Sequence, residues 1–186
     1  MFSGQGGLYA SGRWTPRGQP VVYTSGSISL AVLEYTANYR KRGWVPATVL
    51  GRASIPADVR IETVRPHDLP PKWFAADPPP RLQEIGGQWL RRGKTAVLQV
   101  PSAIVTEEWN YLLNPLHADF GKLEFSVPKA FSFDRRLARN ASAHVDVIRS
   151  DYLPGRNPSN MSRRRSGTVA LSDHGLGCRM TCNVPF

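Results

Sequence analysis

Apolar and polar positions along residues 11–134 follow two periods, one typical of strands and one typical of helices. The pattern predicts a strand, turn and strand in 11–25, further strands at 47–55, 59–64, 95–100 and 122–127, and helices at 29–37 and 81–90. The pattern therefore predicts both strands and helices, and no internal repeat is visible. A length of 186 residues suffices for one domain with a sizeable core.

The stretch 11–37 organises the rest of the chain. Its turn, Thr15-Pro16-Arg17-Gly18, combines a proline that presets φ with a glycine that accepts positive φ. Ser25 or Ser27 can accept a backbone N–H bond and begin the following helix, which Gly43 ends. The face of that helix predicted to be buried carries Leu30, Leu33 and Ala37.

Glu34 lies within this apolar face, four residues after Leu30. Burying an unpaired carboxylate costs more free energy than a helix gains from it, so Glu34 needs a partner. Arg13, presented by the neighbouring hairpin, is the candidate. Two interpretations stay open at this point. Arg13 and Glu34 form a structural ion pair, or they line a cleft in which Arg13 binds an anion and Glu34 faces a developing positive charge.

Residues 65–80 carry six prolines, which exclude regular structure there. We expect the aromatic residues Trp73 and Phe74 to pin this long loop to the core. The paired glycines Gly86-Gly87 of the next helix allow a neighbouring backbone to approach closely. The face of this helix predicted to be buried carries Leu82, Ile85 and Trp89.

Thr95–Val100 is the clearest buried strand, and Ser102 follows it. A hydroxyl just beyond a central strand lies where open α/β sheets bind ligands, although a serine that caps the following turn is as common. His117 is predicted to be a structural histidine and not a base. The final predicted strand, 122–127, places Leu123, Phe125 and Val127 on one face.

The composition changes after Leu137. Residues 138–186 contain no Lys, Glu or Trp and show no sustained period, so they cannot bury enough apolar surface to order themselves. We therefore predict one domain at 1–137 and a disordered basic tail at 138–186.

The net charge of +10 is spread along the chain, which argues against specific nucleic-acid binding. No run of about 18 apolar residues predicts a membrane span, and the N-terminus lacks the features of a signal peptide, so we expect a cytoplasmic protein. Cys178 and Cys182 cannot form a four-ligand zinc site without suitable histidines, and we predict no metal site.

Several motifs occur together and in order. They are Gly12-Arg13-Trp14, Val22-Tyr23-Thr24-Ser25, Leu30-Ala31-Val32-Leu33-Glu34, Leu69-Pro70 with Trp73, Gly86 with Trp89-Leu90, Val100-Pro101-Ser102-Ala103, Asn110-Tyr111-Leu112-Leu113-Asn114-Pro115 and Phe131-Ser132-Phe133-Asp134-Arg135-Arg136-Leu137. Over roughly residues 3–137 the chain resembles the RES domain, the toxin half of bacterial RES–Xre toxin–antitoxin pairs.

The resemblance implies a mixed-sheet α/β fold related to the ADP-ribosyltransferase toxins. It also implies that NAD is a substrate and not a resident cofactor. The expected reaction is cleavage of the nicotinamide–ribose bond by phosphorolysis, hydrolysis or ADP-ribosyl transfer. The expected partner is an Xre-like antitoxin protein.

The family's arginine, glutamate and serine match Arg13, Glu34 and Ser102. Glu34 is expected to stabilise positive charge on the ribose, and Arg13 to bind the diphosphate or an attacking phosphate. Tyr23 is expected to stack on the nicotinamide or ribose. Ser102, and with it Asn110, is expected to bind the substrate.

Family domains usually begin with a further strand that carries another arginine. Only twelve residues precede Arg13 here and none is basic, so we expect the domain to lack its first strand. The alternative function is accordingly an inactive RES remnant that retains only partner binding. A basic nucleic-acid-binding protein is a third hypothesis, supported by charge alone.

Overall fold

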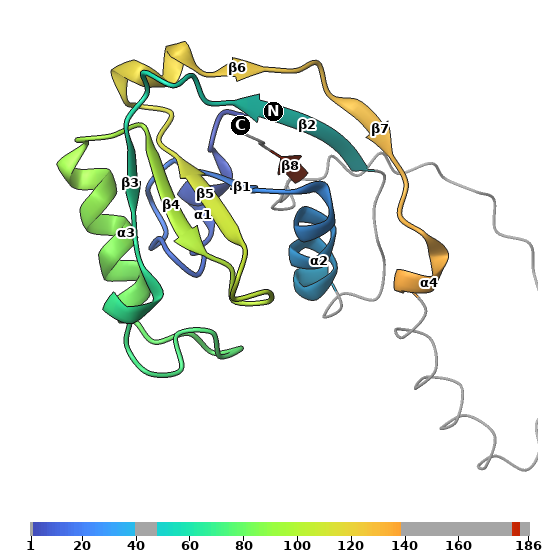
Figure 1. Ribbon diagram of the computed structural model, residues 1–186, viewed down its shortest axis with the longest axis horizontal. Helices are drawn as coiled ribbons and strands as arrows, with labels where there is room; N and C mark the ends of the chain where they lie inside the picture. The colour runs from blue at the N-terminus through green and yellow to red at the C-terminus, as the bar shows by residue number, and fades with distance from the viewer. Residues whose placement is uncertain (1, 40–47, 139–179, 183–186) are drawn as a thin grey trace, which may run out of the picture.

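The computed structural model describes residues 2–39, 48–138 and 180–182. Its core is one mixed sheet with the strand order β3-β4-β5-β1-β8-β2-β6, and β7 pairs with β2 (Figure 1). The strands are β1 (Val22–Ser25), β2 (Thr48–Ser54), β3 (Ile61–Thr63), β4 (Val97–Pro101), β5 (Trp109–Leu113), β6 (Glu124–Phe125), β7 (Lys129–Phe131) and β8 (Met180–Cys182). The helices are α1 (Gly6–Tyr9), α2 (Ile28–Tyr39), α3 (Arg81–Arg92) and α4 (Arg135–Ala138), with short 3-10 helices η2 (Pro66–Asp68) and η3 (Ala118–Lys122).

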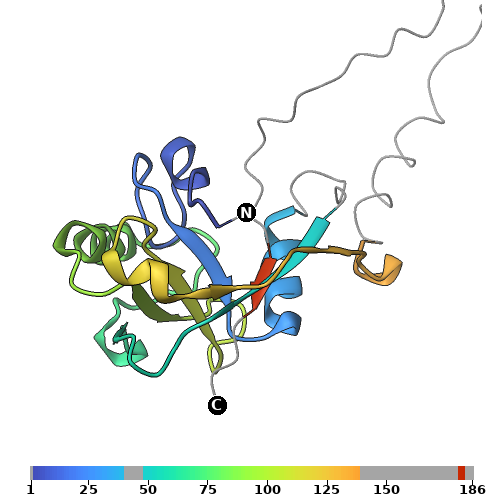
Figure 2. The same cartoon turned by 90° about the horizontal axis from the view of Figure 1, so that it is seen from above.

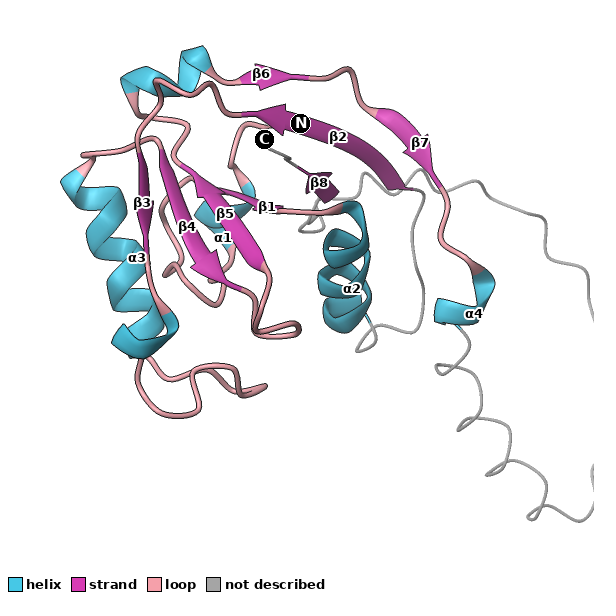
Figure 3. Ribbon diagram, in the orientation of Figure 1, coloured by secondary structure: helices cyan, strands magenta, loops and turns pink. Residues whose placement is uncertain are grey.

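Helices α2 and α3 lie beside different parts of this sheet. Figure 3 shows α3 next to β3 and β4, whereas α2 follows β1 and lies near β8. Seen from above in Figure 2, the segment of β6 and β7 extends along β2, away from α3. The mixed α/β architecture predicted from the sequence is confirmed, since β3 pairs with β4 in parallel and β4 pairs with β5 antiparallel.

Strands β4, β5 and β1 form the centre of the sheet. Their apolar side chains Val97, Leu98, Val100, Leu112 and Leu113 have no exposed surface. The predicted strand at 95–100 is therefore confirmed within two residues. Trp109–Leu113 was not predicted as a strand, and its pairing with both β1 and β4 places Asn110 opposite Ser25 on one side and Val100 on the other.

The buried face of α2 differs from the predicted one. Leu30 is fully buried as expected, but Leu33 is 39% exposed and Ala37 is also exposed. The helix instead buries Ala31 and Tyr35, which pack with Leu50, Phe131 and Phe133. The packing of Phe131, the last residue of β7, and of Phe133 after it thus shifts the buried face of the helix toward Tyr35. Ser27 caps the helix as one of the two predicted alternatives, and Gly43 lies outside the described residues.

The hairpin predicted in residues 11–25 is wrong, because residues 11–20 form turns and no strand. Strand β1 pairs with β5 on one side and β8 on the other, so neither edge is left for residues 11–14. A turn forms at residues 17–18, slightly later than predicted, and Gly18 has the expected positive φ, +100°. The Gly12 N–H donates to the Thr15 carbonyl at 2.9 Å, which closes the loop around the buried Trp14.

Helix α3 confirms the predicted helix at 81–90 and the role of its glycines. A Cβ at Gly86 would clash with the Trp14 carbonyl oxygen, and one at Gly87 would press on Pro16. The absence of side chains at these two positions lets the Trp14–Pro16 segment lie against the helix. Leu82 and Trp89 anchor the same helix in the core with no exposed surface.

The proline-rich loop contains only the short helix η2. Trp73 is buried and holds the loop as predicted, whereas Phe74 is 53% exposed and does not. The ring of Phe74 meets Trp73 edge-on instead, at 5.7 Å between ring centroids.

The final predicted strand is shorter than expected. Within 122–127 only Glu124–Phe125 pairs, with β2, and Val127 is 80% exposed. Pro128 has no N–H to donate to β2, and pairing resumes only in β7. Strands β7 and β8 follow, so this strand is also not the last one.

Most of the predicted tail, residues 139–179 and 183–186, lies outside the described residues. Met180–Cys182 is described as strand β8, in parallel between β1 and β2, where the sequence predicts no regular structure. Cys178 lies outside the described residues. In the described ranges no helix is long and apolar enough to cross a membrane, and no cluster of three metal-ligating side chains occurs.

Candidate active site

Glu34 is the centre of a polar cluster built from three elements. Its Oε1 accepts the Ser102 Oγ–H at 2.9 Å and an Asn110 Nδ2–H at 2.6 Å. Ser102 follows β4, Asn110 lies at the start of β5, and α2 begins three residues after the Ser25 that pairs with Asn110. The strand order β4-β5-β1 therefore brings together three residues that are separated by up to 76 positions in the chain.

Ser102 has no exposed surface. Its Oγ accepts the backbone N–H groups of Ile104 and Val105, each at 3.1 Å. Both lone pairs of the hydroxyl are thus used to cap the turn after β4, and its one hydrogen points to Glu34. The capping role that the sequence allowed is therefore present, and the same side chain also makes a contact with Glu34 that was not predicted.

Asn110 has an oriented side-chain amide. A carboxylate oxygen only accepts hydrogen bonds, so the NH₂ group must face Glu34 and the carbonyl oxygen must face away. That Oδ1 atom is buried, and no described residue donates to it. An unsatisfied buried acceptor costs about 1–3 kcal/mol, so this orientation is held at the expense of stability.

The second oxygen of Glu34, Oε2, receives no hydrogen bond from any residue in the described ranges. The carboxylate is partly exposed and is held through one oxygen only. It can therefore present the other oxygen to a positively charged or hydroxyl-bearing ligand.

Arg13 does not form the structural ion pair with Glu34 that the sequence allowed. Its Nη1 donates to the carbonyl oxygens of Trp73 and Ala75, both at 2.9 Å, and the described residues contain no salt bridge between Arg13 and Glu34. Burial lowers the pKa of the Arg13 guanidinium, and the negative charge of Glu34 opposes that shift. The two side chains therefore interact through their charges without a direct hydrogen bond. Each charge is left to face a ligand group of the opposite sign.

Tyr23 connects the Arg13 segment to the sheet. Its hydroxyl shares a 2.8 Å hydrogen bond with Thr15 Oγ1, and its ring end fills the space where a side chain on Gly12 would lie. Gln83 of α3 donates to the Gly12 carbonyl at 2.9 Å. The backbone around Arg13 is thus fixed by β1 on one side and by α3 on the other.

Glu108 is a further carboxylate beside this cluster that the sequence did not single out. Its Oε2 accepts the Ser27 Oγ–H at 3.0 Å, while Ser27 Oγ accepts the Leu30 N–H at 3.1 Å. A negative charge at a helix N-terminus is favourable, so Glu108 stabilises the first turn of α2. Its position immediately before β5 and two residues before Asn110 is the signal that could have identified it.

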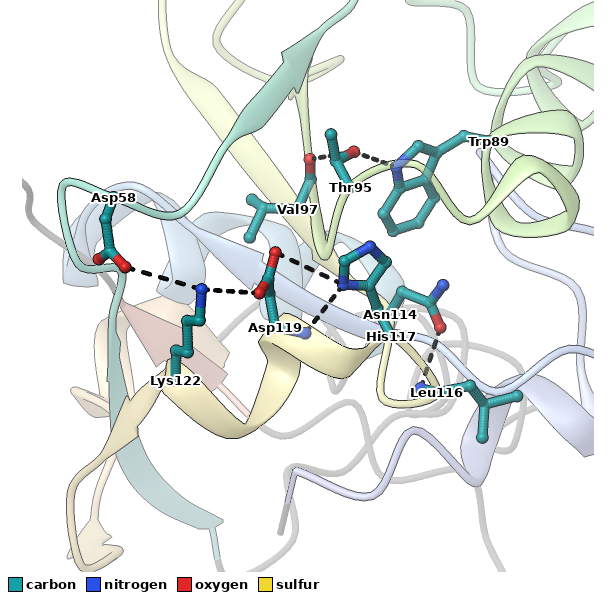
Figure 4. Close-up of polar contacts among 9 residues, drawn as sticks. All are labelled: Asp58, Trp89, Thr95, Val97, Asn114, Leu116, His117, Asp119 and Lys122. Carbon is teal, nitrogen blue, oxygen red and sulfur yellow. Dashed lines mark hydrogen bonds and ion pairs between the residues drawn. The ribbon is translucent and has the colours of Figure 1, made fainter.

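The opposite ends of β4 and β5 carry a second set of polar side chains (Figure 4). Trp89 Nε1–H donates to Thr95 Oγ1 at 2.9 Å, and Asn114 Oδ1 accepts the Leu116 N–H at 3.0 Å. His117 Nδ1 accepts the Asp119 N–H at 3.0 Å and caps η3, which confirms the predicted structural histidine.

A family model and several named proteins match most of this chain. The family model described as "RES domain" matches residues 1–136, a range that includes all five predicted site residues. The chain is similar to the protein named "Toxin Res" of Yersinia enterocolitica, with 34% identity over 137 residues, 73% of this chain and 90% of that protein.

Two further relatives have similar coverage. The "Prs ADP-ribosylating toxin" of Sphingobium sp. is 34% identical over 143 residues, 75% of this chain and 88% of that protein. The "Toxin Res" of Photorhabdus laumondii is 36% identical over 139 residues, 74% of this chain and 88% of that protein.

Proposed function

Because the chain belongs to the RES domain family, we propose that it is a toxin enzyme that cleaves the nicotinamide–ribose bond of NAD. The observation that carries the proposal is the carboxylate of Glu34, whose Oε1 is held by two donors while no described residue bonds to its Oε2. The name of the Sphingobium relative, an ADP-ribosylating toxin, supports a reaction that uses the same bond.

Glu34 suits the charge that this reaction develops. As the bond between the ribose C1′ and the nicotinamide nitrogen breaks, its electron pair goes to that nitrogen and the nicotinamide leaves as a neutral molecule. The ribose acquires oxocarbenium character until an oxygen of phosphate, water or a protein acceptor bonds to C1′ and loses its proton. A fixed carboxylate in a partly buried site stabilises that positive charge.

Arg13 suits the other end of the substrate. A guanidinium matches the oxygens of a diphosphate, and Nη1 is already held by Trp73 and Ala75. The remaining N–H groups make no hydrogen bond to a residue in the described ranges and are available to the diphosphate. Tyr23, fixed by Thr15, supplies an aromatic face beside the same segment.

We further propose that the partner is an Xre-like antitoxin that covers this site. Large exposed apolar side chains lie on the segments that carry the site. Leu33 precedes Glu34 and is 39% exposed, Ile104 follows the Ser102 turn and is 41% exposed, and Phe74 lies between the two carbonyls that hold Arg13. Exposed apolar surface around a site is typical of a protein-binding surface.

The test is to incubate the purified chain with NAD, with and without phosphate, and to identify the products. We expect the chain to consume NAD and the Glu34→Gln variant to do so roughly 10²–10³-fold more slowly, the scale for losing one preorganised electrostatic contact. Its melting temperature should be unchanged, since Gln retains the shape and accepts the same two hydrogen bonds.

Glu107→Gln is the matched control, because Glu107 is exposed and, within the described ranges, its carboxylate accepts a hydrogen bond from Thr106 alone. It should consume NAD at the wild-type rate. A folded Glu34→Gln variant with wild-type activity would contradict the assignment of Glu34. A wild-type chain that leaves NAD intact would instead favour the inactive remnant.

A further inference from the structure

We propose that Ser102 and Asn110 are positioning residues that hold one oxygen of Glu34 and do not contact the substrate. This inference rests on the proposed function and differs from the expectation, drawn from the sequence, that both residues bind the substrate. It assigns contact with the ribose to Oε2 of Glu34 alone.

The surroundings of Ser102 exclude direct contact. The side chain is fully buried, and its hydroxyl makes three hydrogen bonds, two accepted from the backbone at Ile104 and Val105 and one donated to Glu34. A hydroxyl has one hydrogen and two lone pairs, so no capacity remains for a ribose hydroxyl or a nicotinamide amide. Ser102 can therefore influence the reaction only through Glu34 and the turn that it caps.

Asn110, which is partly buried, holds the same oxygen of Glu34 from the neighbouring strand. Its amide donates to the same Oε1 atom at 2.6 Å, while its own carbonyl oxygen is buried and lacks a donor among the described residues. The Oδ1 atom has almost no accessible surface, so a substrate cannot reach it in this arrangement. The structure tolerates an unsatisfied acceptor and thereby directs the NH₂ group to Glu34.

Two donors on one oxygen fix the plane of the carboxylate. A partly exposed glutamate samples several rotamers, and its two oxygens exchange by rotation. Donors from β4 and β5 that converge on Oε1 oppose this rotation and keep Oε2 pointing away from them. A displacement of about 1 Å at a reacting group can cost roughly 100-fold in rate. Removing one of the two donors should therefore lower the rate of NAD cleavage measurably.

The experiment is a double-mutant cycle in the full chain with NAD as substrate. Ser102→Ala should lower kcat about tenfold, the rate equivalent of one hydrogen bond to a charged group, and change KM for NAD less than about twofold. In the Glu34→Gln background the same substitution should cost less than about twofold, because the charge that it positions is gone. Ser102→Thr, which keeps the hydroxyl, should recover part of the loss.

Thr95→Val is the matched control for a buried hydroxyl of β4. Thr95 lies just before β4, at the opposite end of the strand from Ser102, and it bonds the Trp89 indole and the Val97 carbonyl. Thr95→Val should lower the melting temperature while the folded fraction cleaves NAD at the wild-type rate. A Ser102→Ala effect that is only structural would follow the same pattern, and it would overturn the proposal.

Other outcomes also decide the question. If Ser102→Ala raises KM, or if its full cost persists in Glu34→Gln, Ser102 contacts the substrate; the proposal is then wrong while NAD cleavage stands. If the wild-type chain does not cleave NAD, the proposed function fails. The affinities of the wild type and of Ser102→Ala for NAD, measured by calorimetry, then decide whether Ser102 is a positioning residue. Equal affinity of the wild type and Ser102→Ala supports positioning. Weaker binding by the variant, or no binding by either protein, overturns it.

Discussion

The two ends of strands β4 and β5 carry the same residue types in different roles. Thr95 and Ser102 are buried hydroxyls at either end of β4, and Asn114 and Asn110 are amides at either end of β5. At the Thr95 end every one of these side chains bonds a backbone group or the Trp89 indole (Figure 4). At the Ser102 end the donors converge on the charge of Glu34.

This difference separates polar groups that stabilise the fold from those that the proposed function uses. The Thr95 and Asn114 side chains satisfy groups that folding buries, so they contribute to stability. The other end keeps an unsatisfied acceptor on Asn110, a carboxylate held by one oxygen and an arginine that is not paired with it. Groups that lower stability in this way are typical of functional sites. Because both ends carry the same residue types, the sequence alone does not reveal which end holds the candidate site.

Among the substitutions that test this comparison of the two ends, the largest effect is expected for Arg13→Lys. A lysine has no planar fork and cannot hold both loop carbonyls and a diphosphate, so NAD cleavage should fall roughly 100-fold. The loop should also open, and trypsin should cut more rapidly after Lys72, which mass spectrometry of timed digests would measure. The substitution leaves the number of tryptic sites unchanged.

Arg17→Lys is the matched control for that change, because Arg17 is exposed and lies four residues after Arg13 in the same loop. It should alter neither activity nor the digestion pattern. If Arg13→Lys digests like the wild type, the two carbonyl contacts do not hold the loop.

An intermediate effect is expected from the pair Asn110→Ala and Asn114→Ala. Asn110→Ala should lower NAD cleavage roughly tenfold and change the free energy of unfolding by less than about 0.5 kcal/mol, since it removes a donor and an unsatisfied acceptor together. Asn114→Ala should cost about 1 kcal/mol of stability, because the Leu116 N–H loses its partner, and leave activity unchanged. Urea unfolding measures the change in stability, and initial rates measure the change in NAD cleavage. If the two variants respond identically, the two ends of the strands do not differ in role.

The smallest effect is expected from Lys122→Met at the end shown in Figure 4. Lys122 lies 2.9 Å from Asp119 and 3.7 Å from Asp58, and all three side chains are partly exposed to solvent. The hydrogen bond from Lys122 lowers the pKa of Asp119. The stabilisation is therefore complete above the ordinary pKa of an aspartate, near pH 4, and is lost as the pH falls through the lower value in the folded state.

Lys122→Met should accordingly lower the melting temperature by only about 1–2 °C at pH 7. The difference should shrink at high salt and at low pH, as scanning calorimetry would show. A difference that grows on acidification would contradict the assigned pair.

The sequence predicted the position of Glu34 better than its partner. A carboxylate at helical spacing from Leu30 indicates a partly buried charge, but the bonds to Asn110 and Ser102 depend on the pairing of β5 with β1, which no local pattern encodes. Arg13 and Glu34 have opposite charges, yet the guanidinium bonds carbonyls about 60 residues away. Backbone carbonyls carry no sequence information, so this contact could not be predicted.

The errors in the fold have a similar origin. Leu33 and Tyr35 are both apolar enough to be buried, and only the packing of Phe131 and Phe133 selects Tyr35. The predicted hairpin failed because β1 has better partners in β5 and β8 than in residues 11–14. Helix α3 was predicted well because Leu82, Trp89 and the glycine pair act within one continuous segment.

The pairing of Ser25 with Asn110 also determines when the site can form during protein synthesis. A ribosome adds the roughly 85 intervening residues in about 4–17 s at ~5–20 residues per second. Helix α2 leaves the ribosome with Glu34 before either of the donors that hold it has been translated. A nascent chain that ends before residue 110 therefore has the glutamate without the site, and any NAD cleavage begins only when β5 has joined β1.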